Sequence, residues 1–166
     1  MNFKSRISST IRAAVVASAA LSSIAFAGPS NVPFKATLVT QEELRFDMTH
    51  ASCPVLVGTT TASGHASHMG AVSGISTDCA APYGNTFVFN NGKLTLTAAN
   101  GDELHGNYSG SLSPTATPPI NSIAGSYQVT GGTGRFSGAS GMGPLQGITN
   151  IQTYQGQLQL SGTISY

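Results

Sequence analysis

Residues 127–141 read YQVTGGTGRFSGASG, and this stretch decides the fold that the sequence predicts. Its first part is rich in residues that favour strands, and it runs into a glycine cluster that a helix does not tolerate. Gly131, Gly132 and Gly134 allow a tight turn, since glycine takes positive φ or packs closely where a side chain would clash. Phe136 then supplies an apolar anchor. We therefore predict a strand, a structural turn with an aromatic plug, and a second strand.

This stretch resembles the "ITGGTGRF…GA.G" signature of the allene oxide cyclase and dirigent superfamily. It is most similar to bacterial secreted proteins with an allene-oxide-cyclase-like barrel, whose "G.ATH.G" segment resembles the sequence around His65 and His68. The resemblance implies an all-β fold, a single antiparallel β-barrel of about eight strands. It carries no activity over, because the likeness to the plant proteins is confined to residues 125–147 and their catalytic carboxylates have no matching positions here.

The amino-terminal residues have the pattern of a secretory signal peptide. Three basic residues precede an apolar, alanine-rich stretch, and the small residues Ala25 and Ala27 suit a signal peptidase. The apolar stretch is too short for a permanent membrane anchor, and no other stretch is apolar enough for a membrane span. We expect a signal peptide over residues 1–27, one barrel domain over residues 28–166, and an exported protein that is periplasmic or secreted.

The chain after the expected signal peptide is short of charge. Four basic and six acidic residues remain there, a formal charge of −2, and only 8% of the whole sequence is charged. Nucleic acid is therefore not an expected partner. All 20 glycines lie at or after position 28, and this composition favours an exported all-β domain over a helical one. The oligomeric state is left open.

Cys53 and Cys79 are the only cysteines. In an exported chain an even number of cysteines predicts a disulfide between them. The alternative is a pair of metal or redox ligands, which the lack of a C-x-x-C motif disfavours. Closing a loop of this length would stabilise the fold by about 3 to 4 kcal/mol through chain entropy.

Alternating side chains and turn residues place strands along the rest of the chain. The expected strands cover residues 34–40, 43–49, one or two segments within 55–77, 86–89, 93–98 and 102–112. Asn90–Gly92 and Asn100-Gly101 predict two hairpin turns, because Asn-Gly suits turns that need positive φ. Prolines in residues 113–121 predict a long surface loop. Together these segments predict an antiparallel meander.

Two of the strands have one apolar face that is interrupted by glycines. These faces hold Leu104, Gly106, Tyr108, Gly110 and Leu112 in one strand, and Leu158, Leu160, Gly162, Ile164 and Tyr166 in the last strand. Glycines on an apolar face suggest the tight curvature of a small closed barrel. If that face points inward, Tyr108 and Tyr166 are candidates for lining a ligand cavity, and His68 is a third candidate.

For the other candidate functional residues, the sequence favours structural roles over binding or catalysis. The glycine turn before Arg135 lacks the spacing of a phosphate-binding loop, so we expect Arg135 to bind backbone carbonyls or a carboxylate. His65 and His68 would point to opposite sides of a strand, which argues against a shared metal. We expect a buried, hydrogen-bonded His68. No metal and no cofactor are predicted.

Two acidic pairs, Glu42-Glu43 and Asp102-Glu103, are expected to be solvated charges at turns, since neighbouring side chains on a strand diverge. The chain has no G-x-S-x-G motif of the hydrolases. We therefore expect a non-enzymatic barrel that binds a small apolar ligand or serves as a structural envelope or surface module. The alternative is a cavity enzyme of the cyclase, isomerase or dirigent type. A filled interior would favour a structural role, and an empty apolar interior would favour a carrier. An apolar interior with a lone buried acid or histidine would favour an enzyme.

Overall fold

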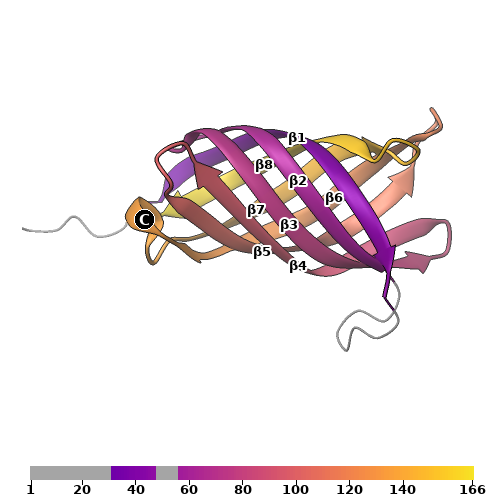
Figure 1. Cartoon of the computed structure of the whole chain (residues 1–166), viewed down its shortest axis with the longest axis horizontal. Helices are drawn as coiled ribbons and strands as arrows, with labels where there is room; N and C mark the ends of the chain where they lie inside the picture. Colours follow the sequence, from indigo (N-terminus) through magenta and orange to yellow (C-terminus); the bar gives the residue numbers. More distant parts are fainter. Residues whose placement is uncertain (1–30, 48–55) are drawn as a thin grey trace, which may run out of the picture.

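The computed structural model describes residues 31–47 and 56–166, and within them the chain forms a closed antiparallel barrel (Figure 1). The eight strands are β1 (Val32–Phe46), β2 (Leu56–Ala66), β3 (Gly70–Tyr83), β4 (Thr86–Ala98), β5 (Glu103–Pro114), β6 (Ile120–Gly132), β7 (Ser140–Asn150) and β8 (Gln155–Ser165). Each strand pairs with the next one along the chain, and β8 pairs with β1. The predicted all-β meander barrel is confirmed.

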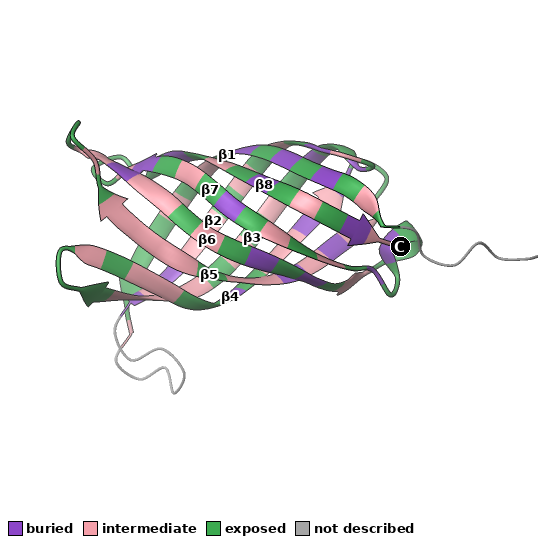
Figure 2. Cartoon of the chain, turned by 180° about the vertical axis from the view of Figure 1, so that it is seen from behind, coloured by how far each residue is buried: buried purple, intermediate pink, exposed green. Residues whose placement is uncertain are grey.

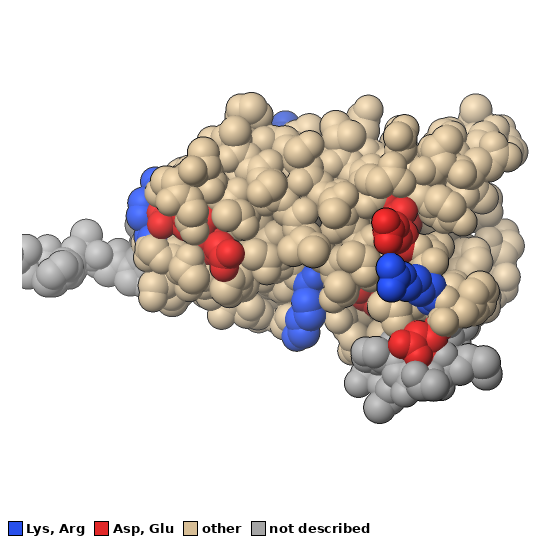
Figure 3. Space-filling view, in the orientation of Figure 1, with Lys and Arg blue, Asp and Glu red and all other residues tan. Residues whose placement is uncertain are grey.

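Closure of the sheet leaves these strands without an unpaired edge. β1 pairs with β2 over residues 36–46 and with β8 over residues 32–41, so both of its sides are engaged. An open edge would favour pairing between molecules, because the charged side chains that discourage such pairing are few in the sequence and sparse on the face that Figure 3 shows. No helix in the described part of the chain is long and apolar enough to cross a membrane.

The barrel has a closed end and an open end. The closed end holds the 3₁₀ helix η1 (Gly134–Phe136), the turns at residues 67–69 and 99–102, and the C-terminus. The open end holds the turns at residues 84–85, 115–119 and 151–154. Figure 2 shows most buried positions toward the end that carries the C-terminus. The packed core therefore fills one half of the barrel.

Phe136 is the plug of the closed end that the sequence predicts. Its side chain is fully buried, and its ring centroid lies 4.9 Å from that of Tyr166. The largest fully buried side chains are Phe136, Leu38, Leu96, Leu160 and Ile164. Burial of each stabilises the fold by about 1.5 to 3 kcal/mol relative to exposure.

Several of the expected strand ends are wrong. Residues 34–40 and 43–49 were expected as separate strands, but β1 runs without a break through Glu42 to Phe46. Its ladders with β2 and β8 overlap across residues 36–41, and this pairing outweighs the local polarity of Gln41-Glu42-Glu43. The loop expected over residues 113–121 is also shorter, because β5 extends to Pro114 and β6 begins at Ile120.

The turn predicted at Asn90–Gly92 is a β-bulge inside the continuous strand β4. Phe89 pairs with Gly110 and Gly92 pairs with Tyr108, so two residues of β4 face one residue of β5. Asn91 has the positive φ of 54° that the Asn-Gly pattern indicates, but a bulge uses that conformation as well as a hairpin does. The second predicted turn, at Asn100-Gly101, does connect two strands.

Candidate functional site

The open half of the barrel contains a cavity of about 320 Å³. Most of its lining is apolar and comes from Leu44, Leu56, Ala80, Phe87, Phe89, Leu94, Leu112, Ile123, Leu145, Ile151 and Leu158. The polar lining comes from Thr40, Glu42, Thr60, Ser76, Asp78, Tyr108, Thr149 and Tyr154. A volume of this size is at the lower end of small-molecule pockets, and an apolar wall with a few polar groups is their usual composition.

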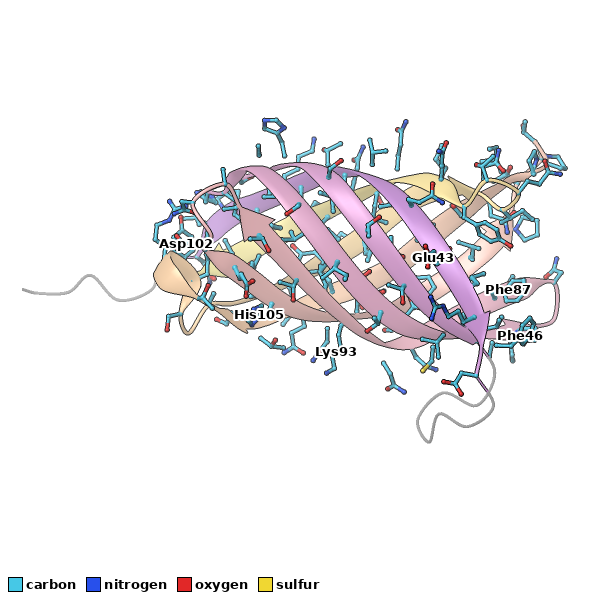
Figure 4. The ribbon with its side chains drawn as sticks, viewed as in Figure 1. Glu43, Phe46, Phe87, Lys93, Asp102 and His105 are labelled. Atoms are coloured by element: carbon cyan, nitrogen blue, oxygen red, sulfur yellow. The ribbon has the colours of Figure 1, made fainter. Side chains whose placement is uncertain are left out.

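Large apolar side chains stand exposed around the open end. Phe46 and Tyr83 are 82% and 74% exposed, and Phe87, Ile151 and Tyr154 are between 40% and 45% exposed. Figure 4 places Phe46 and Phe87 together at this end, with Asp102 at the opposite end. The cavity therefore has an apolar mouth.

Strand alternation carries Glu42 to the cavity wall. Phe34, Ala36 and Leu38 of β1 are buried in the core, and Thr40 and Glu42 continue the same inward face. The backbone N–H of Glu42 donates a 2.9 Å hydrogen bond to the carbonyl oxygen of Tyr154. This bond fixes β1 against the turn between β7 and β8.

Asp78 reaches the cavity from β3 at an irregular point in the sheet. The pairing of β3 with β4 shifts register between Thr77 and Cys79, opposite the bulge of β4. The extra residue belongs to β4, so β3 keeps its alternation there. Ser76, Asp78 and Ala80 therefore all face the cavity.

Tyr108 donates a hydrogen bond from its hydroxyl to Oδ2 of Asp78 over 2.7 Å. Its ring lies against Gly92, where a Cβ atom would be 2.6 Å from Cδ1 of Tyr108. Gly92 therefore leaves the space that the ring occupies. Phe89 packs beside it, with ring centroids 5.9 Å apart.

The two carboxylates lie on either side of Gly58. A Cβ atom at position 58 would lie 2.8 Å from Oδ1 of Asp78 and 3.1 Å from Oε1 of Glu42. The absent side chain leaves room for both acids to face the same space. Oδ1 of Asp78 is buried and has no hydrogen-bond partner in the described part of the chain.

Burial changes the acidity of all three groups. Burial, and secondly the charge of Asp78, raise the pKa of Glu42 from 4.5 to about 7. Burial raises the pKa of Asp78, and the hydrogen bond from Tyr108 partly offsets this rise. Burial and the charge of Asp78 also raise the pKa of Tyr108. Glu42 therefore exchanges a proton near neutral pH, as a general acid or base does.

The three ligand-lining candidates from the sequence lie at different ends of the barrel. Tyr108 lines the cavity. Tyr166 packs on Phe136 at the closed end, and His68 lies 5.7 Å from Tyr166 between ring centroids. Tyr108 is therefore the candidate that the structure brings to Glu42 and Asp78.

His68 is hydrogen-bonded as expected, but the expectation that it is buried is wrong. It lies exposed in the turn after β2, and a nitrogen of its ring is 2.9 Å from the carbonyl oxygen of Pro33. The strand ends at Ala66, so His68 follows the turn and not the alternation of β2. In residues 31–47 and 56–166, no three His, Cys, Asp or Glu side chains gather as a metal site.

The glycine turn connects β6 to η1 and holds Arg135 at the closed end. The guanidinium of Arg135 donates hydrogen bonds to Oδ2 of Asp102 over 2.9 Å and to the carbonyl oxygen of His68 over 3.1 Å. The predicted partners, a carboxylate and a backbone carbonyl, are both present. Asn100 and Arg135 lower the pKa of Asp102. Arg135 thus ties η1 to two turns of the closed end.

The expectation that the acidic pairs are solvated turn charges is wrong for Glu42 and incomplete for Asp102. Glu42 lies within a strand and faces the cavity, whereas its neighbour Glu43 points outward, with its side chain 71% exposed. The signal was present in the sequence, because unbroken alternation from Phe34 places Glu42 on the inward face. Asp102 follows a turn but is held by Arg135.

No family model matches the chain, and no curated protein matches it. The predicted disulfide also stays a prediction. Cys79 lies in β3 directly after Asp78, and Cys53 lies outside the described residues.

Proposed function

We propose that the protein binds a small, mostly apolar molecule in the cavity at the open end of the barrel. The single observation that carries this proposal is the cavity of about 320 Å³, lined largely by leucine, isoleucine and phenylalanine. Burial of an apolar molecule against such a wall supplies the binding free energy. A purely structural barrel would have no need for an empty half.

A matched pair of variants tests this proposal. Ala80 lines the cavity, and Ala71 lies exposed on the same strand near the closed end. We expect Ala80→Phe to fill the cavity and abolish binding of fatty alcohols and phenolics in a calorimetric titration. Ala71→Phe should bind them as the wild type does. No binding by the wild type, and no ligand retained in native mass spectrometry of protein from its own host, would instead support a structural module.

A cavity enzyme of the cyclase, isomerase or dirigent type is the second candidate function. The specific observation in its favour is the group formed by Glu42, Asp78 and Tyr108, since acids with strongly shifted pKa values cluster at catalytic sites. Glu42 would move the proton in such a reaction. Once a retained ligand is identified, its conversion by the wild type and not by Glu42→Gln would establish this function.

Export and family membership are part of the same proposal. The resemblance to the allene oxide cyclase and dirigent superfamily implies an eight-stranded antiparallel barrel, and the chain has that architecture. The expected signal peptide over residues 1–27 lies outside the described residues. We expect the exported protein to begin at Gly28, which amino-terminal sequencing of the periplasmic and culture fractions would test.

A further inference from the structure

The carboxyl groups in the cavity lining have no basic counterpart there. Glu42 and Asp78 line it, and no lysine, arginine or histidine of the described residues does. Three of the basic side chains have partners elsewhere: Arg45 lies near Glu43, Lys93 donates to Asn107, and Arg135 donates to Asp102. The cavity therefore holds two acids whose charge no described side chain of the lining balances.

One acidic oxygen is also left without a hydrogen bond. Tyr108 occupies Oδ2 of Asp78, while Oδ1 is buried and has no partner in the described part of the chain. Such an atom costs free energy unless something donates to it. Oε1 of Glu42 and Oδ1 of Asp78 lie 3.1 Å and 2.8 Å from the point where a Cβ of residue 58 would be, so the two oxygens are close enough for one donor group to reach both acids.

We infer that the cavity takes an apolar amine, with its ammonium group held between Glu42 and Asp78. The inference rests on the proposed function, ligand binding in this cavity. An ammonium group has three N–H donors and a positive charge, so it satisfies Oδ1 of Asp78 and balances the second acid. The apolar part of the amine lies against Phe89, Leu94 and Leu158.

Other ligand chemistries fit this site less well. An alcohol donates one hydrogen bond and brings no charge, so one acid stays unbalanced. A fatty acid brings a carboxylate beside two acids, and like charges in a desolvated site repel strongly. We therefore expect the affinity of the cavity to decrease from the amine to the alcohol to the carboxylate.

The amine should bind more tightly as pH rises. Among the described residues, the titratable groups that line the cavity are Glu42 from β1, Asp78 from β3, Tyr108 from β5 and Tyr154 from the turn after β7. An ammonium pairs with the ionised acid, and the pKa of Glu42 is about 7. Between pH 6 and pH 8 an alkylamine stays protonated while Glu42 loses its proton. Affinity for a neutral alcohol should change little over this range.

The experiment compares octylamine, 1-octanol and octanoate, which share one chain, by calorimetric titration of the exported protein at pH 6 and pH 8. We expect octylamine to bind at least tenfold more tightly than 1-octanol at pH 8, with octanoate weakest. Equal affinity for octylamine and 1-octanol would overturn the inference and leave the proposed function intact. No binding of any of the three would overturn both.

Substitutions of the two acids test where the ammonium group binds. Glu42→Gln and Asp78→Asn should each weaken octylamine binding at least tenfold at pH 8, a larger loss than either substitution causes for 1-octanol. Glu43→Gln is the matched control, since Glu43 is adjacent but points outward. Octylamine affinity that is unchanged in a folded Glu42→Gln variant would overturn the inference. If that variant does not fold, a wild-type preference for octylamine that does not grow between pH 6 and pH 8 would overturn it.

Discussion

At the closed end, β1 presents Phe34, Ala36 and Leu38 to the barrel interior, whereas at the open end the same strand presents Thr40 and Glu42. The first three side chains join a packed core around Phe136. The other two line a cavity. One continuous strand thus contributes to a filled half and to an empty half.

The two halves of the barrel have different roles: the closed half stabilises the fold, and the open half holds the candidate functional site. Apolar packing in the closed half stabilises the barrel, and Arg135 and Phe136 seal that end. The open half contributes less packing and contains two acids whose ionised forms are disfavoured by burial. Proteins keep such destabilising groups mainly where a ligand or a reaction uses them.

The largest effect that we expect is from loss of the plug. Phe136→Ala should lower the free energy of unfolding by about 3 to 5 kcal/mol, because it leaves a cavity in the packed half. Phe87→Ala, at the mouth of the open half, should cost less than about 1 kcal/mol, since Phe87 is 41% exposed. Urea denaturation measures both values. Equal losses of unfolding free energy in the two variants would contradict the distinction between a packed half and an empty half.

The predicted disulfide would strengthen the open half. A bond from Cys53 to Cys79 would connect the segment after β1 to β3, next to Asp78. We expect no alkylated thiol when the unreduced protein is treated with iodoacetamide and weighed by mass spectrometry. Reduction should lower the free energy of unfolding by about 3 kcal/mol. Two alkylated cysteines in the native protein would disprove the bond.

Two glycines of the closed end form a matched pair. Gly134 and Gly138 have positive φ angles of 54° and 78°, so alanine is strained at both. Only at position 134 would the new Cβ also meet the carboxylate of Asp102, the partner of Arg135. We expect the free energy of unfolding, measured by thermal denaturation, to fall by about 2 kcal/mol for Gly134→Ala and by about 1 kcal/mol for Gly138→Ala. A larger loss at position 138 would contradict the role of the ion pair.

The smallest effect concerns pH. The folded protein raises the pKa of Glu42 from 4.5 to about 7, so it binds this proton more tightly than the unfolded chain does. The free energy of unfolding should therefore fall as pH rises from about 4.5 to 7, by about 1 kcal/mol after allowance for solvent screening. Glu42→Gln should flatten this slope, and Glu43→Gln should not. Denaturant titrations between pH 4.5 and pH 8 measure it.

Much of the fold could be predicted because its signals are local. The glycine turn, the plug Phe136 and the inward faces of β5 and β8 follow from residue type and from alternation. The errors arise where pairing with distant strands overrides a local preference. Asn91-Gly92 favours a turn in isolation, but in the barrel it forms a bulge that makes room for Tyr108.

The candidate site was harder to predict than the fold. Splitting β1 at residue 41 put Glu42 in a turn, and ending the next strands at Thr77 left Asp78 out of consideration. These two errors in strand length hid both acids. Of the cavity residues, Tyr108 was recognised, because residues 103–112 of its strand were placed correctly.

The sequence by itself determined the all-β class, the turn chemistry and the face on which most side chains lie, because these depend on neighbours along the chain. Only the tertiary structure decided that one half of the barrel is filled and the other empty, and that Glu42, Asp78 and Tyr108 meet across Gly58 and Gly92. These residues come from five different strands. Their meeting depends on the register of every ladder between them, which no local pattern encodes.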